Sequence, residues 1–188
     1  RFAKIIETKY HLKAINFSTT KEIYPYVDEM FALFNETYSK LASFVPISGR
    51  QINYFKEKYL RFIHPEFVKF VSDENNKLVA FAITMPSYAK AMQKARGHLF
   101  PFGFLHLLKA KRKNDTVDFY LIGVLPEYQK KGVTSIIFSE YFKTYKKHHI
   151  KIARRTPELE DNQDIQLIWK NFNPKIYIRR ATFLKKIH

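Results

Sequence analysis

The sequence contains no cysteine and no long apolar run. The lack of cysteine excludes disulfide frameworks, thiolate metal sites and a cysteine nucleophile. No apolar run approaches the roughly 20 residues that a membrane-spanning helix needs. The seven histidines do not show the spacing of metal ligands. We therefore expect a soluble, cytoplasmic protein with no membrane partner and no metal site.

Acidic residues are scarce: 17 Asp and Glu residues stand against 33 Lys and Arg residues, which gives a formal net charge of +16. Such a surplus favours polyanionic or phosphorylated partners, among them nucleic acid and anionic cofactors. The basic residues are spread over short clusters, such as 109–113, 143–147 and 185–186. This spread is typical of solvated helix faces, so we weigh nucleic acid as a partner but do not favour it.

The length allows one well-buried domain, because 46% of the 188 residues are apolar. The sequence has no internal repeat, low-complexity tract or clear linker, so residues 1–188 are predicted to form a single domain. The chain begins with Arg1 rather than methionine and shows no signal-peptide pattern. We therefore expect that an upstream segment precedes it.

Apolar periodicity and turn residues predict the order of the elements. Helices are expected at 20 to about 38 or 41, 48–62, 88–95, 104–113, 133–145 and 165–172. Strands are expected at 12–17, 67–71, 78–85, 119–125, 150–153 and 175–187. Asp161 or Asn162 would cap the last helix. This order predicts an α/β (α+β) fold, with a mixed sheet and helices on both faces.

One stretch, Val117 to Tyr145, combines a buried strand, a tight turn and an amphipathic helix. The turn contains Pro126, and Lys131-Gly132 leads into the helix. Such a turn directs free backbone N–H groups and the positive end of a helix dipole to one point. A ligand with phosphate groups is the natural guest there.

The same stretch carries a family motif. Gln129, Gly132 and Thr134 have the spacing of a glutamine, two residues, a glycine, one residue and a small residue, after a strand that ends in Val124-Leu125-Pro126. This pattern and the element order resemble the GNAT superfamily of acyl-CoA N-acyltransferases. The resemblance implies a mostly antiparallel central sheet and acetyl-CoA or another acyl-CoA as cosubstrate.

The resemblance also implies a cofactor site made mainly of backbone groups. The splayed end of the strand would pair with the pantetheine arm, and the amides of the following loop would hold the pyrophosphate. An asparagine after the next strand would contact the arm or lie near the acyl group. The implied cofactor-binding residues are Ile122, Gly123, Val124, Gln129, Lys130, Lys131, Gly132, Val133, Thr134 and Asn162.

More narrowly, the hairpin, the 100–103 loop and residues 159–162 resemble the C-terminal part of larger, uncharacterised bacterial GNAT-like proteins. Within the motif, Thr134 replaces a glycine or alanine. Downstream, Trp169 occupies the position of a tyrosine that often protonates the leaving thiolate, and an indole N–H is too weak an acid for that role.

Amine acylation needs a base for the attacking ammonium and donors for the oxyanion. Period two places Asp118, Tyr120 and Ile122 on one face of the central strand, and Phe119, Leu121 and Gly123 on the other. We predict Tyr120 and Glu158 as catalytic residues, with Asp118 as a further candidate. A solvated or salt-bridged carboxylate remains the simpler interpretation of each acid. A backbone N–H near Val124 is the oxyanion donor that the resemblance implies.

The sequence therefore predicts an acyl-CoA-dependent N-acyltransferase with an unidentified amine acceptor. One alternative is an inactive GNAT-like binding or regulatory module, whose basic surface contacts nucleic acid or an acidic partner. Another is half of a tandem acyltransferase, whose acceptor site is completed by an upstream part. Residues 100–104 would line an acyl or acceptor pocket, or pack into the core.

Overall fold

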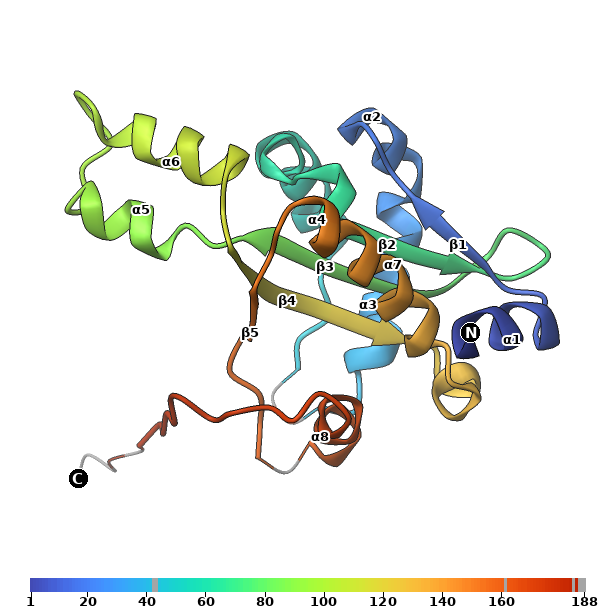
Figure 1. The fold of residues 1–188 in the computed structure, drawn as a ribbon. Helices are drawn as coiled ribbons and strands as arrows, with labels where there is room; N and C mark the ends of the chain where they lie inside the picture. Colours follow the sequence, from blue (N-terminus) through green and yellow to red (C-terminus); the bar gives the residue numbers. More distant parts are fainter. Residues whose placement is uncertain (42–43, 161, 184, 186–188) are drawn as a thin grey trace.

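The computed structural model describes residues 1–41, 44–160, 162–183 and 185, and its centre is a five-stranded sheet (Figure 1). The strands lie in the order of the sequence. Neighbours are antiparallel, except that the last two are parallel. The predicted fold class is confirmed: the sheet is mixed and mostly antiparallel. The strands are β1 (Lys13–Asn16), β2 (Val68–Ser72), β3 (Leu78–Pro86), β4 (Thr116–Val124) and β5 (Ile152–Arg155).

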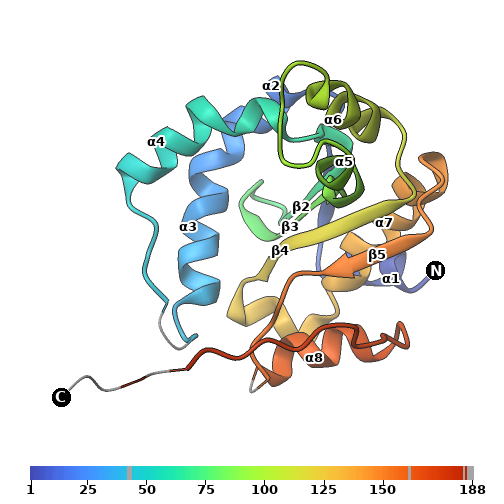
Figure 2. The ribbon, with the colours of Figure 1, turned by 90° about the vertical axis from the view of Figure 1, so that its left-hand side faces the viewer.

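Helices cover both faces of the sheet (Figure 2). On one face α3 packs on β3, where the Phe34 and Phe81 rings lie 6.4 Å apart. On the other face α7 packs on the sheet, and its Tyr141 Oη donates to the Phe67 carbonyl at 3.1 Å. The helices are α1 (Phe2–Lys9), α2 (Thr20–Ile23), α3 (Val27–Tyr38), α4 (Gly49–Lys58), α5 (Ala89–Lys94), α6 (Gly103–Arg112), α7 (Thr134–Lys147) and α8 (Gln163–Lys170), with 3₁₀ turns at η1 (Tyr24–Tyr26), η2 (Leu60–Phe62), η3 (Pro65–Phe67) and η4 (Pro126–Lys131).

Local signals explain where the helices on the α3 face begin. Ser48 and Gln51 form a reciprocal capping box at the start of α4, as the predicted cap requires. The helix expected from residue 20 to about 38 or 41 is observed as far as Tyr38, but a 3₁₀ turn interrupts it, so that the segment forms α2, η1 and α3. Pro25 lies in η1 and lacks the N–H group that a continuous helix needs, so the regular hydrogen bonding breaks there.

The two ends of the chain differ from the sequence prediction. No element was predicted before residue 12, but residues 2–9 form α1, which packs against α7. The final strand predicted at 175–187 is wrong for residues 175–183, which form no strand. Ile176 and Phe183 in this segment are 68% and 93% exposed, so nothing covers the apolar residues that suggested a strand. Residues 184 and 186–188 lie outside the described part.

Between β3 and β4 the chain forms a helical hairpin of α5 and α6 that extends away from the sheet (Figure 1). Phe100 and Phe102 in its loop are 81% and 70% exposed. The expectation that residues 100–104 pack into the core is therefore wrong for Phe100 and Phe102, and their role in an acyl or acceptor pocket stays a prediction. Among the helices of the described residues, none combines the length and apolar character needed to cross a bilayer.

Candidate functional site

The last two strands separate part of the way along β4. β5 pairs with β4 from Thr116 to Phe119, and the Thr156 N–H then donates to the Phe119 carbonyl at 3.2 Å. β4 continues to Val124, but no described strand pairs with residues 120–124 on that side. A length of strand edge is therefore left with backbone groups available to a guest.

The polar groups on this open edge can be assigned from the strand geometry. The Leu125 N–H donates to the Val79 carbonyl on the β3 side. Because backbone groups alternate along a strand, the N–H and C=O groups of Ile122 and Val124 point to the open side. Both carbonyls already accept a side-chain donor there: Tyr38 Oη lies 3.0 Å from Ile122 O, and Gln129 Nε2 lies 3.1 Å from Val124 O. The N–H groups at Ile122 and Val124 face the same side.

A β-bulge interrupts β4 at Tyr120. Phe119 pairs with Thr84 and Leu121 pairs with Ile83, so Tyr120 has no partner directly opposite on β3. A bulge inserts one extra residue into one strand and bends it. The bend occurs next to the point where β5 leaves.

The bulge also overturns the predicted alternation of β4. The Phe119 ring packs against Tyr141 of α7, at 5.3 Å between ring centroids. A Cβ at Gly123 would instead meet Thr37 Oγ1 of α3 at 2.9 Å. Phe119 and Gly123 therefore lie on opposite faces, and the same shift separates Asp118 from Ile122. Period two cannot anticipate this, because one extra residue inverts every later position.

At the far end of the open edge lies the start of α7. Gly132 adopts a left-handed conformation with φ of 75°, which glycine tolerates at no steric cost. Ser135 N–H and Ile136 N–H bond back to the Gly132 and Val133 carbonyls, and α7 begins at Thr134 with no acidic residue in its first turn. The first amides of a helix lack partners within the helix and carry partial positive charge. The positive end of the α7 dipole therefore lies at this loop.

The same loop contacts α1 and carries two lysines. A Cβ at Gly132 would meet Phe2 and Ile6 of α1 at 3.4 and 3.5 Å, which are ordinary contact distances. The constraint on Gly132 is therefore its backbone angle and not a lack of space. Lys131 Nζ lies over the rings of Tyr128 and Tyr10, at 4.4 and 5.4 Å from their centroids.

On the α3 face, Tyr120 lies near a charged pair. Arg154 of β5 bonds to Asp118 Oδ1 at 2.8 Å and also donates to the Ser87 hydroxyl. Burial raises the pKa of Tyr120, and the Asp118 carboxylate adds to this rise while Arg154 opposes it. The pKa of Tyr88, at the base of α5, is also raised, first by burial and then by Tyr120. Tyr120 thus keeps its proton at neutral pH and can donate a hydrogen bond.

Glu158 lies just beyond β5 and is held by two donors. Arg155 Nη1 lies 2.8 Å from Oε2, and the Trp169 indole Nε1 lies 2.9 Å from Oε1. Burial raises the pKa of Glu158, and this effect outweighs the lowering by Arg155 and the indole. Burial also raises the pKa of Tyr38, and the Glu158 charge adds to it, so Glu158 lies within electrostatic reach of the open edge.

The predicted site residues thus fall into four places: Tyr120 at the bulge, the open edge at 122–124, the loop at 129–134, and the residues beyond β5. Asn162 lies in the fourth place, where its Oδ1 accepts from Ile165 N at 3.3 Å and caps α8, as predicted. Asp161, the other predicted cap, lies outside the described residues. The sequence did not indicate that Tyr38 contacts the open edge, because an aromatic residue four positions after Phe34 in a helix is typical of a core residue.

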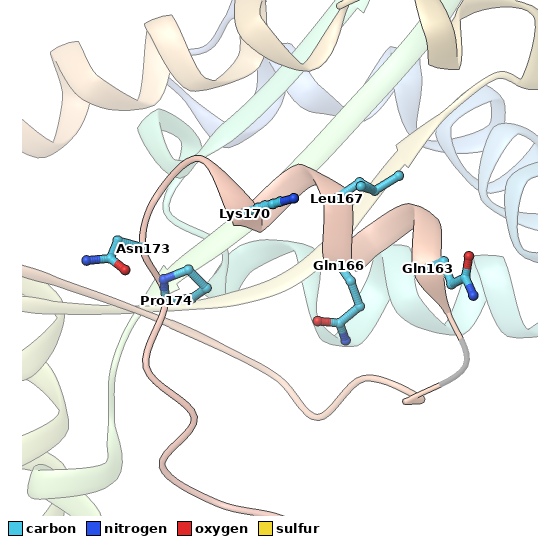
Figure 3. A pocket seen from close by; sticks show the side chains of 6 residues that line it. All are labelled: Gln163, Gln166, Leu167, Lys170, Asn173 and Pro174. Atoms are coloured by element: carbon cyan, nitrogen blue, oxygen red, sulfur yellow. The ribbon is translucent and has the colours of Figure 1, made fainter.

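A separate hollow of about 570 Å³ lies on the outer side of α8 (Figure 3). The residues of α8 that line the hollow have the spacing of one helix face. Trp169, whose ring packs on Phe119, lies on the opposite face of α8. The hollow is therefore not the gap between β4 and β5. In the described part of the chain, no group of three or more His, Asp or Glu residues is placed to hold a metal ion. The lining residues are Gln163, Gln166, Leu167, Lys170, Asn173 and Pro174.

Solved structures of N-acetyltransferases share this overall fold. The aminoglycoside 6'-N-acetyltransferase AAC(6')-Ih from Acinetobacter baumannii is 12% identical with a TM-score of 0.55, and the match covers 94% of this chain and 99% of that one.

Two further structures are similar at the same level. The aminoglycoside acetyltransferase meta-AAC0020, from an uncultured soil metagenomic sample, is 12% identical with a TM-score of 0.57 over 97% of this chain and 99% of that one. AAC(6')-Iy, in complex with the bisubstrate analogue CoA-S-monomethyl-acetylneamine, is 12% identical with a TM-score of 0.54 over 94% and 99%. At such identities the likeness establishes the fold. No protein-family model and no curated protein matches the sequence.

Proposed function

We propose that this chain is an acyl-CoA-dependent N-acyltransferase, with acetyl-CoA as the first candidate cosubstrate. One observation carries the proposal: the open edge of β4 leads along the chain, through the single 3₁₀ segment η4, into the start of α7. An extended amide-containing arm that ends in a pyrophosphate fits these two features in that order. The complex of AAC(6')-Iy with a CoA bisubstrate analogue supports the choice of ligand.

In this proposal the cofactor residues act mainly through the backbone. The N–H group of Ile122 would pair with a pantetheine amide, and the amides of 129–134 would hold the pyrophosphate. The Gln129 side chain would act indirectly, because it ties the loop to the Val124 carbonyl. Asn162 would bring the start of α8 close to the arm. The whole stretch of 188 residues would serve as one acyl-CoA-binding domain.

The chemistry would be transfer of an acyl group from the thioester sulfur to an amine nitrogen. A new C–N bond forms, the C–S bond breaks, and the ammonium proton must go to a base. Glu158 is the candidate base, since burial raises the pKa of its carboxyl and makes it a better proton acceptor. The Val124 N–H would stabilise the oxyanion, and Tyr120 would orient the acceptor from the other side of the bulge.

Calorimetric titration with acetyl-CoA and longer acyl-CoAs tests the first step. Gly132→Val should abolish binding, because a branched side chain cannot keep the left-handed backbone angle that the loop requires. Gly97→Val is the matched control: Gly97 has φ of +77° and open space around it, and it lies in the α5–α6 hairpin. This control carries the same backbone strain outside the loop and should still bind.

No binding of any acyl-CoA by the wild type would overturn the proposal. If binding is found, release of free thiol across a panel of amines measures turnover. Binding without turnover would favour the inactive module. One observation supports that alternative: Trp169 stands in place of a tyrosine and donates its indole N–H to Glu158. Salt-dependent binding of DNA with no effect of CoA would point to that module as well.

A further inference from the structure

The α5–α6 hairpin carries charge of one sign only. Between Ala89 and Lys113 the sequence has no Asp or Glu. Except for Lys111, which is half-buried, all of its cationic residues are exposed, so they can meet an external surface. An ion pair of 3.9 Å links Lys90 to Asp115, which lies just outside the hairpin. The seven cationic residues are Lys90, Lys94, Arg96, Lys109, Lys111, Arg112 and Lys113.

The tip of the same hairpin is apolar and exposed. Phe100 and Phe102 are 81% and 70% exposed, and the Phe100 ring packs loosely on Phe104 at 6.1 Å. Leu105 and Leu108 on α6 are each 50% exposed and continue the apolar surface along the helix. Two phenyl rings at the tip and two leucine side chains further along α6 thus face water. Exposed apolar patches of this kind mark interaction sites.

The shape of the hairpin restricts the partner. The tip is the part of the hairpin that lies farthest from the sheet, so it projects from the rest of the molecule (Figure 1). A protein partner would have to offer a matching groove, whereas a lipid surface accepts a projecting tip without one. An apolar tip inserts among acyl chains, and cations beside it are attracted by anionic headgroups.

We propose that the tip of the α5–α6 hairpin docks on an anionic lipid surface, with Phe100 and Phe102 inserted and with Lys94 and Arg96, which adjoin the tip loop, at the headgroups. Insertion of a loop tip needs no spanning helix. The inference therefore departs from the expectation of no membrane partner, which rested on the lack of a spanning run. It stands on the hairpin alone and does not depend on acyl transfer.

Co-sedimentation with vesicles tests the proposal. The wild type should bind vesicles of phosphatidylcholine with phosphatidylserine far more strongly than vesicles of phosphatidylcholine alone, and salt should weaken the binding. The double variant Phe100→Ser with Phe102→Ser should bind at least about tenfold more weakly, because it loses the inserted rings. Phe183→Ser is the matched control, since Phe183 is 93% exposed and lies far along the chain in the C-terminal segment.

A second pair of variants separates charge from insertion. Lys94→Glu with Arg96→Glu should weaken binding to the anionic vesicles by about tenfold or more, because these exposed cations adjoin the tip and each cation near the surface contributes to attraction. Lys146→Glu, an exposed site on α7, makes one charge reversal away from the hairpin and should have a much smaller effect.

Fluorescence reports insertion directly. The chain has one tryptophan, Trp169, which is only 7% exposed, so Phe102→Trp adds a probe at the tip against a steady background. Its emission should shift to the blue with anionic vesicles. Three results would overturn the proposal: no preference for phosphatidylserine, equal binding by the double serine variant, or a dimer that the serine variant abolishes while vesicles are ignored. The last result would assign the tip to a second copy of the chain.

Discussion

The Trp169 indole donates a hydrogen bond of 2.9 Å to Glu158, and Arg155 donates to the other carboxylate oxygen at 2.8 Å. Trp169 is buried between α8, β4 and α7, where its ring packs on Phe119 and Phe138. The aromatic core therefore fixes the direction of the Glu158 side chain. Trp169 thus positions Glu158, the base of the proposed reaction.

This pairing predicts a pH dependence for acyl transfer. Burial raises the pKa of Glu158 above its usual value, and only the deprotonated carboxylate accepts a proton. The rate should therefore rise with pH through the raised pKa and level off above it. Glu158→Gln should lower kcat by about 100-fold or more and remove this rise. The measurement is thiol release against pH with saturating acyl-CoA.

A companion variant tests the cause of the shift. The indole hydrogen bond lowers the pKa of Glu158, so Trp169→Phe should raise it further and move the profile to higher pH. The phenyl ring retains most of the packing on Phe119. An unchanged profile in Trp169→Phe, together with full activity of Glu158→Gln, would remove Glu158 from the mechanism.

Much of the fold could be predicted because its signals are local. The β2–β3 hairpin follows from apolar runs around a turn of Asp and Asn residues, and the antiparallel pairing is observed. The cap at Ser48 and the strand–turn–helix of 117–145 also depend on neighbouring residues, and both are found. The parting of the strands followed from the family resemblance and not from periodicity.

The remaining features depend on contacts between distant residues. The bulge at Tyr120 is defined by how β4 pairs with β3. No pattern within the residues of β4 reveals this pairing. The bond between Tyr38 and the Ile122 carbonyl joins residues 84 positions apart. The segment 175–183 has strand-like composition, but composition cannot supply the neighbour that a strand requires.

Tyr120→Phe separates acceptor binding from cofactor binding. The phenol keeps its proton and lies on the α3 face near Asp118, whereas the open edge for the cofactor begins beyond the bulge. The variant should lower kcat/KM for the amine by about 10- to 100-fold, as loss of one positioned donor does. The dissociation constant for acyl-CoA, measured by calorimetry, should not change. A parallel loss of acyl-CoA affinity would contradict this division.

Tyr38→Phe should destabilise the fold. The phenol donates to the Ile122 carbonyl at 3.0 Å in a half-buried position, and one such bond contributes about 1 kcal/mol to the free energy of unfolding. Urea unfolding of the free protein measures the difference. Tyr54→Phe is the control, because Tyr54 is 53% exposed on α4 and its loss should change the unfolding free energy very little. Equal effects of the two variants would show that the bond contributes nothing.

Because Lys69 on β2 is buried, we expect the free energy of unfolding to rise at alkaline pH. Its side chain is only 4% exposed, and Nζ donates to Asn16 Oδ1 at 2.7 Å. Burial lowers the pKa of Lys69 from 10.5 to about 8, although Glu140 opposes the shift. The folded pKa is below the unfolded one, so between pH 8 and 10.5 the unfolded chain binds more protons and stability rises with pH.

The gain from Lys69 should reach at most about 3 kcal/mol across this window. Lys69→Met cannot titrate, so the difference in unfolding free energy between wild type and variant should grow in favour of the wild type as the pH rises from 7. Urea unfolding at a series of pH values measures it. Lys146→Met, at an exposed position, should follow the wild type at every pH. Parallel curves for Lys69→Met and the wild type would mean that the ammonium is solvated in the folded protein, despite its buried position in β2.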